Sequence, residues 1–247
     1  MKQLKENIIR IAHQAGEGHI ASAFSILDLL TVLYGEGFVT AKKEHRFVLS
    51  KGHASLALYT VLAQHNFFAS DKIFSFCAYE SNFGGHPDRT KLSGVEASTG
   101  SLGHGFPMAV GMALAEKIRH TDHKIFVLIG DGELNEGSVW ESMLLATHHR
   151  LDNLYCIVDF NHSTDRALDI GDLQAKFTAF GWHTLSIDGH DHEAIKSAYS
   201  QISVGRPLAI IANTIKGYGC KPMENNPEWH HKAPSSEELD LLLKDLY

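Results

Sequence analysis

The sequence predicts an α/β protein with a parallel sheet and helices on both of its faces. Short continuous apolar runs, typical of strands buried on both faces, alternate along the second half of the chain with segments of helical periodicity. Consecutive parallel strands need crossover connections, and right-handed crossovers place helices on either side of the sheet. The 247 residues suffice for one large core, and no internal repeat divides them. We therefore expect a single domain over residues 1–247.

The first half of the chain predicts helices around one strand and a long loop. Apolar residues at helical spacing predict a first helix through Leu4, Ile8 and Ile11, ended by a Gly-Glu-Gly sequence. A second helix is predicted over residues 26–34, with Ser25 as its N-cap. A short strand, a helix and a glycine-rich loop follow, at residues 46–50, 54–64 and 83–105.

The second half predicts the body of the sheet. Apolar, β-like runs predict strands at residues 124–129, 154–160, 182–187 and 208–212. A helix is predicted after the first of these strands, through Trp140 and Leu144, and another over residues 193–202. A polar stretch then leads to a last helix, which we expect Ser235 or Ser236 to cap.

Composition and charge exclude several classes of function. The net charge is −7 and the basic residues are scattered, which disfavours a nucleic-acid partner. No apolar run approaches the ~18 to 20 residues that a membrane span needs, and the charged N-terminus is unlike a signal peptide. The three cysteines are odd in number and widely spaced, which argues against a disulfide framework. We expect a protein of the reducing cytoplasm.

Polar residues follow two strands that the pattern predicts to be neighbours. Asp131 ends the first apolar run and Asn161 the second, 30 residues later, about the length of one helical crossover. Carboxylate and amide oxygens suit Mg²⁺, and ligands of open α/β sheets bind at the carboxyl ends of strands. Gly130 and Gly132 would let the backbone approach a phosphate, with a helix starting near Glu136 behind it. A Gly-Asp-Gly sequence alone fits a plain turn equally well.

The wider segment GDGELNEGSVWE, followed by the strand end VDFN, resembles the fingerprint of thiamine diphosphate enzymes. Its GDGxLxEGxxWE form is similar to the transketolase branch of that family. The resemblance implies that Asp131, Asn161 and the carbonyl of Ser163 hold Mg²⁺ against the diphosphate of the cofactor. His162 stands where a second Asn is more common.

Five further blocks resemble transketolase in the same order along the chain. They are Gly18-His19, Ser50-Lys51-Gly52-His53, Gly85-His86-Pro87, Thr99-Gly100-Ser101-Leu102-Gly103 and Met223 to His230. The resemblance implies that His53 and His230 lie near the diphosphate and that Gly100 and Leu102 lie along the cofactor. Besides His162, the sequence departs from the family pattern in four places: the Pro-Gly after His19 is lost, and Ser101, His104 and His231 replace Pro, Gln and Gly.

The resemblance also suggests which residues move protons. His19, His86 and His230 are candidates for polarising the substrate carbonyl and for proton transfer to its hydroxyls, a task suited to a pKa near neutrality. Glu136 matches a family carboxylate in a proton network at the subunit interface, and Glu141 is a second candidate. A single histidine is more often structural, and we assign the other histidines, among them His190 and His192, to solvated helix faces and loop tips.

Transketolases also need a glutamate on a pyrimidine-binding domain, which we expect on another chain because the blocks found here match only the diphosphate-binding part. The resemblance therefore implies the N-terminal subunit of a split transketolase, which transfers a two-carbon ketol unit from a ketose phosphate to an aldose. The partner would be a C-terminal subunit carrying the pyrimidine-binding domain, in an α₂β₂ assembly acting on sugar phosphates.

Two other interpretations stay open at this stage. One is another thiamine diphosphate enzyme: a specialised carboligase for an unusual sugar, a carboligase like 1-deoxyxylulose-phosphate synthase, or the α subunit of a 2-oxo-acid dehydrogenase. The other is a binding subunit without catalytic activity. A dinucleotide-binding Rossmann enzyme is disfavoured, because no GxGxxG follows the first strand.

Overall fold

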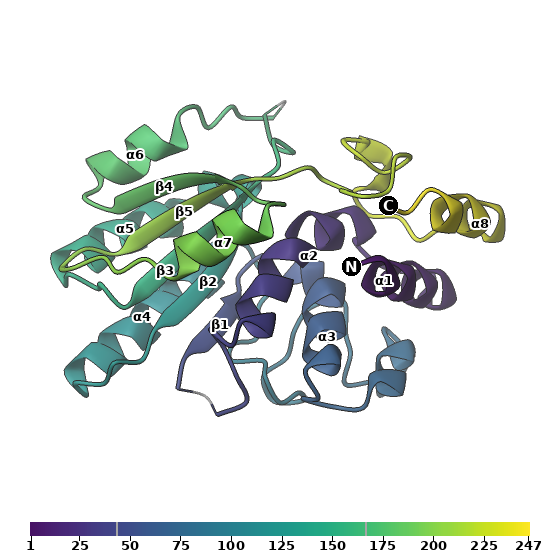
Figure 1. Ribbon diagram of the computed structural model, residues 1–247, viewed down its shortest axis with the longest axis horizontal. Coiled ribbons are helices and arrows are strands. Elements are labelled where there is room, and N and C mark those ends of the chain that lie inside the picture. The colour runs from purple at the N-terminus through teal and green to yellow at the C-terminus, as the bar shows by residue number, and fades with distance from the viewer. Residues whose placement is uncertain (43, 166) are drawn as a thin grey trace.

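A computed structural model describes residues 1–42, 44–165 and 167–247, and Figure 1 shows its sheet flanked by helices. The five strands are all parallel, in the order β1-β2-β3-β5-β4. Their bounds are β1 Arg46–Leu49, β2 Ile125–Gly130, β3 Leu154–Phe160, β4 His183–Asp188 and β5 Leu208–Asn213. The predicted α/β class, with a parallel sheet between helices, is confirmed.

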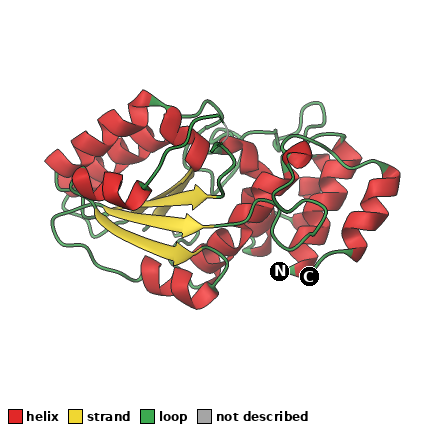
Figure 2. Cartoon of the chain, turned by 90° about the horizontal axis from the view of Figure 1, so that it is seen from above, coloured by secondary structure: helices red, strands yellow, loops and turns green. Residues whose placement is uncertain are grey.

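Helices cover both faces of the sheet, and a further group of helices extends beyond its carboxyl edge (Figures 1 and 2). Five helices share one hydrophobic core: α1 Lys2–Ala15, α2 Ile20–Gly35, α3 Ser55–Gln64, α7 His192–Tyr199 and α8 Ser236–Lys244. The helices of the second core are α4 Gly105–Ile118, α5 Gly137–His148 and α6 Leu173–Ala179. Figure 2 shows both chain ends together at the helical end of the molecule. Among the described residues, no helix is both long and apolar enough to cross a membrane.

The apolar runs are continuous because both faces of the sheet are covered. Successive side chains of a strand point to opposite faces. In β3, Tyr155 and Ile157 pack into the core beneath α2 and α7, whereas Cys156 and Val158 pack into the core beneath α4 and α5. Each of these side chains is buried. Because neither face of the strand meets water, polar residues do not alternate with apolar ones along these four positions.

Strand register brings the predicted site residues to one edge of the sheet. Gly130 of β2 lies level with Asp159 of β3, and Phe160 lies level with Asn213 of β5. The residues that follow these strands therefore leave the sheet side by side, at its carboxyl edge. This register places Asp131 and Asn161 directly after the ends of neighbouring strands, as the spacing predicted.

The element boundaries bear out most of the predicted signals, with one clear error. Gly16 ends α1 in the left-handed conformation (φ 65°), and Ser235 caps α8 through a capping box with Glu238. Ser25 is not an N-cap, because α2 begins earlier, at Ile20, and Ser25 lies inside it. Its hydroxyl donates instead to Asp159 Oδ2, at 2.7 Å. The local pattern suggested a cap because the true partner of Ser25, Asp159, is far away in the sequence.

Candidate active site

A cavity of about 360 Å³ lies at the carboxyl ends of β2, β3 and β5. It brings together every predicted site residue except the two candidate glutamates, Glu136 and Glu141, and adds four that the sequence analysis did not single out. Its lining consists of His19, Ser22, Lys51, His53, His86, Gly100, Leu102, Gly130, Asp131, Gly132, Glu133, Asn161, Ser163, Lys216 and His230. The polar ends of three strands and the loops around residues 53, 86 and 100 thus face one space.

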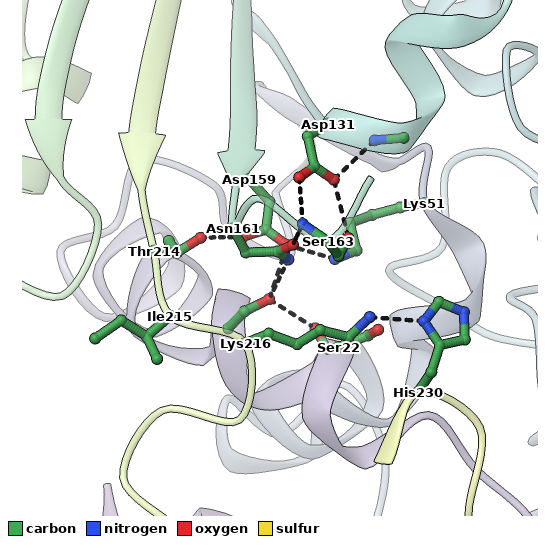
Figure 3. A network of polar contacts seen from close by, with 12 residues as sticks. Ser22, Lys51, Asp131, Asp159, Asn161, Ser163, Thr214, Ile215, Lys216 and His230 are labelled. Atoms are coloured by element: carbon green, nitrogen blue, oxygen red, sulfur yellow. Dashed lines mark hydrogen bonds and ion pairs between the residues drawn. The ribbon is translucent and has the colours of Figure 1, made fainter. Parts of the chain in front are cut away.

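Asp131 and Asn161 converge on a single backbone amide. The N–H of Ser163 donates to Asp131 Oδ2 at 2.9 Å and to Asn161 Oδ1 at 3.1 Å, so one oxygen from each strand end faces the same point (Figure 3). The Gly132 amide also donates to Asp131, at 2.7 Å. Burial, with the nearby charge of Asp159, raises the pKa of the Asp131 carboxyl. Burial thus disfavours the ionised form of Asp131, and a cation beside these oxygens would stabilise it.

These oxygens suit a hard cation better than a transition metal. Within the described part of the chain, no group of three or more His, Cys, Asp and Glu side chains could hold a metal ion. One carboxylate oxygen and one amide oxygen are the kind of incomplete oxygen set that Mg²⁺ completes with water and substrate phosphate. The neighbouring His162 has φ 59°, a conformation that Asn and His adopt more readily than most residues. His therefore fits where Asn is more common.

Asp159, a buried residue that the sequence analysis missed, orients the side chains of Asn161 and Lys51 at this edge of the sheet. Asp159 is fully buried in β3 and forms an ion pair with Lys51. It also accepts hydrogen bonds from the hydroxyls of Ser25 and Thr214, and from Asn161 Nδ2 at 2.9 Å. With its amide nitrogen donating to Asp159, Asn161 presents its oxygen to the Ser163 amide, which also donates to Asp131. Asp159 is the only charged residue in the apolar run 154–160, which was a usable signal.

Three imidazole rings of the cavity lining, those of His19, His53 and His230, lie close together. The ring of His19 lies 5.0 Å from that of His53 and 5.8 Å from that of His230, and His231 stacks on it at 4.3 Å. Burial, reinforced by the neighbouring histidines, lowers the pKa of His19 to about 4. Burial, with the charge of Lys51, lowers the pKa of His53 to about 2. These two rings are therefore neutral at physiological pH.

His86 reaches the cavity past a glycine that has no room for a side chain. Gly100 has φ 153°, and a Cβ atom there would lie 2.9 Å from Cδ2 of the His86 imidazole. The close approach of this backbone to the ring requires glycine. The TGSLG loop and His86 are thus packed directly against each other at the cavity wall.

Lys216 is a further cavity residue that the sequence analysis missed. It follows β5, is buried, and donates a hydrogen bond from Nζ to His230 Nδ1 at 2.7 Å. Because Nδ1 accepts this bond, a neutral His230 carries its proton on Nε2. Burial, with the charge of Lys51, lowers the pKa of Lys216 to about 8. No motif marked this residue within its polar stretch.

The pKa of Lys216 predicts how binding of a diphosphate should depend on pH. Below about pH 8 the side chain is a cation beside the site, and above it the charge is progressively lost. An anionic ligand favours the protonated form, so its affinity should fall by up to about tenfold per pH unit above pH 8. Isothermal titration of thiamine diphosphate between pH 7 and 9.5 would measure this fall. Lys216→Met should bind more weakly at pH 7 and show a flatter profile, and an unchanged profile would contradict the assignment.

Glu133 joins two of the loops that line the cavity. Its buried Oε1 accepts hydrogen bonds from the Ser50 hydroxyl and, at 3.0 Å, from the Gly103 amide. Burial raises the pKa of this carboxyl. Glu136 lies outside the cavity, exposed at the N-cap of α5, and Glu141 is exposed on the same helix. Their assignment to a proton network at a subunit interface stays a prediction.

Comparisons with known proteins agree with this arrangement. Residues 3–246 match the family model described as transketolase, thiamine diphosphate binding domain. The chain is 36% identical to one of the named subunits of apulose-4-phosphate transketolase from Actinobacillus succinogenes, over 99% of this chain and 94% of that protein. The corresponding protein of Phocaeicola vulgatus is 33% identical, over 98% of this chain and 90% of that protein.

Single-chain transketolases match over part of their length. Human transketolase is 36% identical over 99% of this chain but 41% of its own length. The crystal structure of transketolase from Campylobacter jejuni superimposes with a TM-score of 0.86 and 32% identity, covering 99% of this chain and 42% of that one. Sequence, fold and the polar strand ends thus agree that the chain belongs to the transketolase family of transferases and forms the family's thiamine diphosphate binding domain.

Proposed function

We propose that this chain is the N-terminal subunit of a two-chain transketolase. The observation that carries the proposal is coverage: the chain spans 90% and 94% of two proteins that are themselves named as transketolase subunits, but 41% of human transketolase. Residues 1–247 would form one cofactor-binding domain, and a C-terminal subunit would contribute the pyrimidine-binding domain. We expect an α₂β₂ assembly in the cytoplasm.

The cofactor would be thiamine diphosphate with Mg²⁺. Asp131, Asn161 and the carbonyl of Ser163 would hold the metal, supported by the convergence of the two side-chain oxygens. His53, Gly100, Leu102 and the glycines beside Asp131 would contact the cofactor, because all of them line the same cavity. When bound, the cofactor supplies the nucleophilic carbon and the electron sink that cleavage of a ketose C2–C3 bond requires.

The chain's own residues would orient the sugar and move its protons. His19, His86 and His230 line one cavity and can hydrogen-bond the carbonyl and hydroxyls of a ketose. A neutral imidazole can accept a proton at one nitrogen and donate at the other, which suits it to proton transfer without importing charge. Lys216 fixes the ring of His230 so that Nε2–H is free to donate.

The substrate class that we propose is a ketose with a terminal anionic group. Two similar proteins are named for apulose 4-phosphate, and another, from Clostridium sp. (37% identical, 90% of this chain, 86% of that protein), for 6-deoxy-6-sulfo-D-fructose. Both names describe sugars with an anion at the end remote from the reacting carbons. This supports sugar phosphates, or sulfonated equivalents, as donors for the present chain.

The decisive experiment is reconstitution with the C-terminal subunit. Thiamine diphosphate is titrated calorimetrically into the complex and into this chain alone, with and without Mg²⁺, and ketose phosphates are then screened as donors. We expect tight, metal-dependent binding in the complex and ketol transfer to an aldose. Turnover of a 2-oxo acid instead would favour the dehydrogenase or synthase alternatives, and cofactor binding without turnover would favour a non-catalytic subunit.

His86→Ala should separate catalysis from cofactor binding. The imidazole lines the cavity but is not among the hydrogen-bond partners that hold Asp131 and Asn161, so its loss leaves the metal ligands in place. We expect kcat to fall by about 10²- to 10⁴-fold, the range for loss of a general acid–base group, with thiamine diphosphate affinity nearly unchanged. Steady-state kinetics and titration calorimetry on the same complex measure both quantities. A parallel loss of affinity would instead make His86 a cofactor-binding residue.

A further inference from the structure

A buried histidine–aspartate pair, His190 with Asp28, lies outside the cavity lining. Asp28, in α2, accepts a hydrogen bond from His190 Nδ1 at 2.9 Å, and the side chain of His190 is only 6% exposed. His192 contacts the other carboxylate oxygen at 2.8 Å, with its side chain 44% exposed. The assignment of His190 to a solvated loop tip was therefore wrong, because its ring is buried and hydrogen-bonded to Asp28 of α2.

Both ring nitrogens of His190 are engaged, which fixes its tautomer and its orientation. The backbone N–H of Ile215 donates to Nε2 at 2.9 Å, so Nε2 is an acceptor and Nδ1 carries the proton given to Asp28. Burial alone would raise the pKa of Asp28, but the hydrogen bonds from His190 and His192 outweigh it and the pKa is lowered. Tyr218 stacks on the ring at 3.5 Å, with an interplanar angle of 17°.

Ile215, whose amide bonds His190, lies in the chain between Thr214 and Lys216, two residues whose side chains bond groups in or next to the cavity wall. Thr214 donates to Asp159, and Lys216 donates to His230 in the cavity wall. In Figure 3 these two contacts extend from either side of Ile215, whose own side chain points away from the network. β5 ends at Asn213, so strand pairing does not fix the amide of Ile215. A Cβ atom at Gly189 would overlap Thr214 Cγ2, so the loop before His190 also packs closely against this segment.

We propose that His190, oriented by Asp28, is a positioning residue for the segment 214–216 and thereby holds Lys216 at the cofactor-binding cavity. The inference rests on the proposed function only for the identity of the ligand. His190 does not line the cavity, so it acts through the Ile215 amide and not by touching the cofactor.

Two substitutions at position 190 separate the two hydrogen bonds. His190→Asn keeps a donor near the place of Nδ1 for Asp28 but lacks an acceptor that reaches Ile215. His190→Gln places its amide oxygen near the place of Nε2 and keeps that acceptor. His192→Ala is the matched control, because His192 contacts Asp28 from the partly exposed side and makes no bond to residues 214–216.

Two measurements would be made on each variant in complex with the C-terminal subunit. We expect His190→Asn to raise the Kd for thiamine diphosphate with Mg²⁺ about tenfold, the lower end for losing an outer partner of a ligand-binding residue. In hydrogen–deuterium exchange, the amides of residues 214–218 should exchange about tenfold faster. His190→Gln should restore both values to within about threefold of wild type, and His192→Ala should leave both unchanged.

Either of two results would overturn the positioning role. Faster exchange in His190→Asn without weaker cofactor binding would show that the anchor does not serve the site. Equal losses in the Asn and Gln variants, with a matching drop in thermal stability, would show a purely structural role. Failure of the wild-type complex to bind thiamine diphosphate would refute the proposed function itself, whereas hydrogen–deuterium exchange of residues 214–218 tests the positioning role independently of that ligand.

Discussion

Asp131→Ala should abolish the Mg²⁺-dependent binding of thiamine diphosphate. Asp131 supplies the only carboxylate of the proposed oxygen set, and the amides of Gly132 and Ser163 hold it in place. Loss of outer partners of metal ligands typically costs 10- to 100-fold in affinity, so loss of the ligand itself should cost about 100-fold or more. Titration calorimetry on the two-chain complex, with and without Mg²⁺, would measure the effect.

Asp131→Asn is the matched control for that experiment. The Gly132 amide donates to Oδ1 and the Ser163 amide to Oδ2, so the single amide oxygen of Asn can keep one of these two bonds, while the negative charge is lost. We expect weak residual binding with reduced dependence on Mg²⁺. Wild-type affinity in the Ala variant would refute the assignment of the metal site.

Asp159→Ala should destabilise the fold by about 3–5 kcal/mol, the typical cost of leaving one member of a buried ion pair without its partner. Lys51 is 2% exposed and its ammonium group pairs with Asp159, so the substitution would leave a buried charge uncompensated. The hydroxyls of Ser25 and Thr214 would also lose their acceptor. Urea unfolding of the isolated chain, followed by circular dichroism, would measure the change in unfolding free energy.

Two further variants would show whether the charge is the cause. Lys51→Met combined with Asp159→Leu removes both charges and should recover much of the lost stability, because apolar replacement of a buried pair is often neutral. Asp240→Ala, on the exposed side of α8, should change the unfolding free energy by no more than about 0.5 kcal/mol. A loss below about 1 kcal/mol in Asp159→Ala would show that water or rearrangement compensates Lys51.

Sequence alone predicted the sheet well because its signal is local. The run 154–160 coincides with β3, since strands buried on both faces are apolar throughout and end where polar residues begin. The pairing of Asp131 with Asn161 followed from the same pattern, because neighbouring parallel strands end at one edge. The resemblance to transketolase then supplied the histidines, which the structure places in the same cavity.

The residues that the sequence did not indicate owe their roles to distant partners. Ser25 resembled a helix cap, but it bonds Asp159 on the central strand β3. His190 resembled a loop tip, but it is buried against Asp28 in α2. Lys216 followed a predicted strand without any motif, and only the fold brings it to His230. Each contact depends on tertiary packing, which no local pattern encodes.

The hydrogen bonds around Asp159 also bear on the thermodynamics of ligand binding. Lys51, Asn161 and Thr214 are already held by this carboxylate in the free chain. Restricting a lysine side chain costs about 1.5–2 kcal/mol of rotamer entropy, which here is lost during folding and not during association. The part of the binding site that Asp159 holds is therefore preorganised, and the ordering that accompanies binding should be confined to groups outside this hydrogen-bond network.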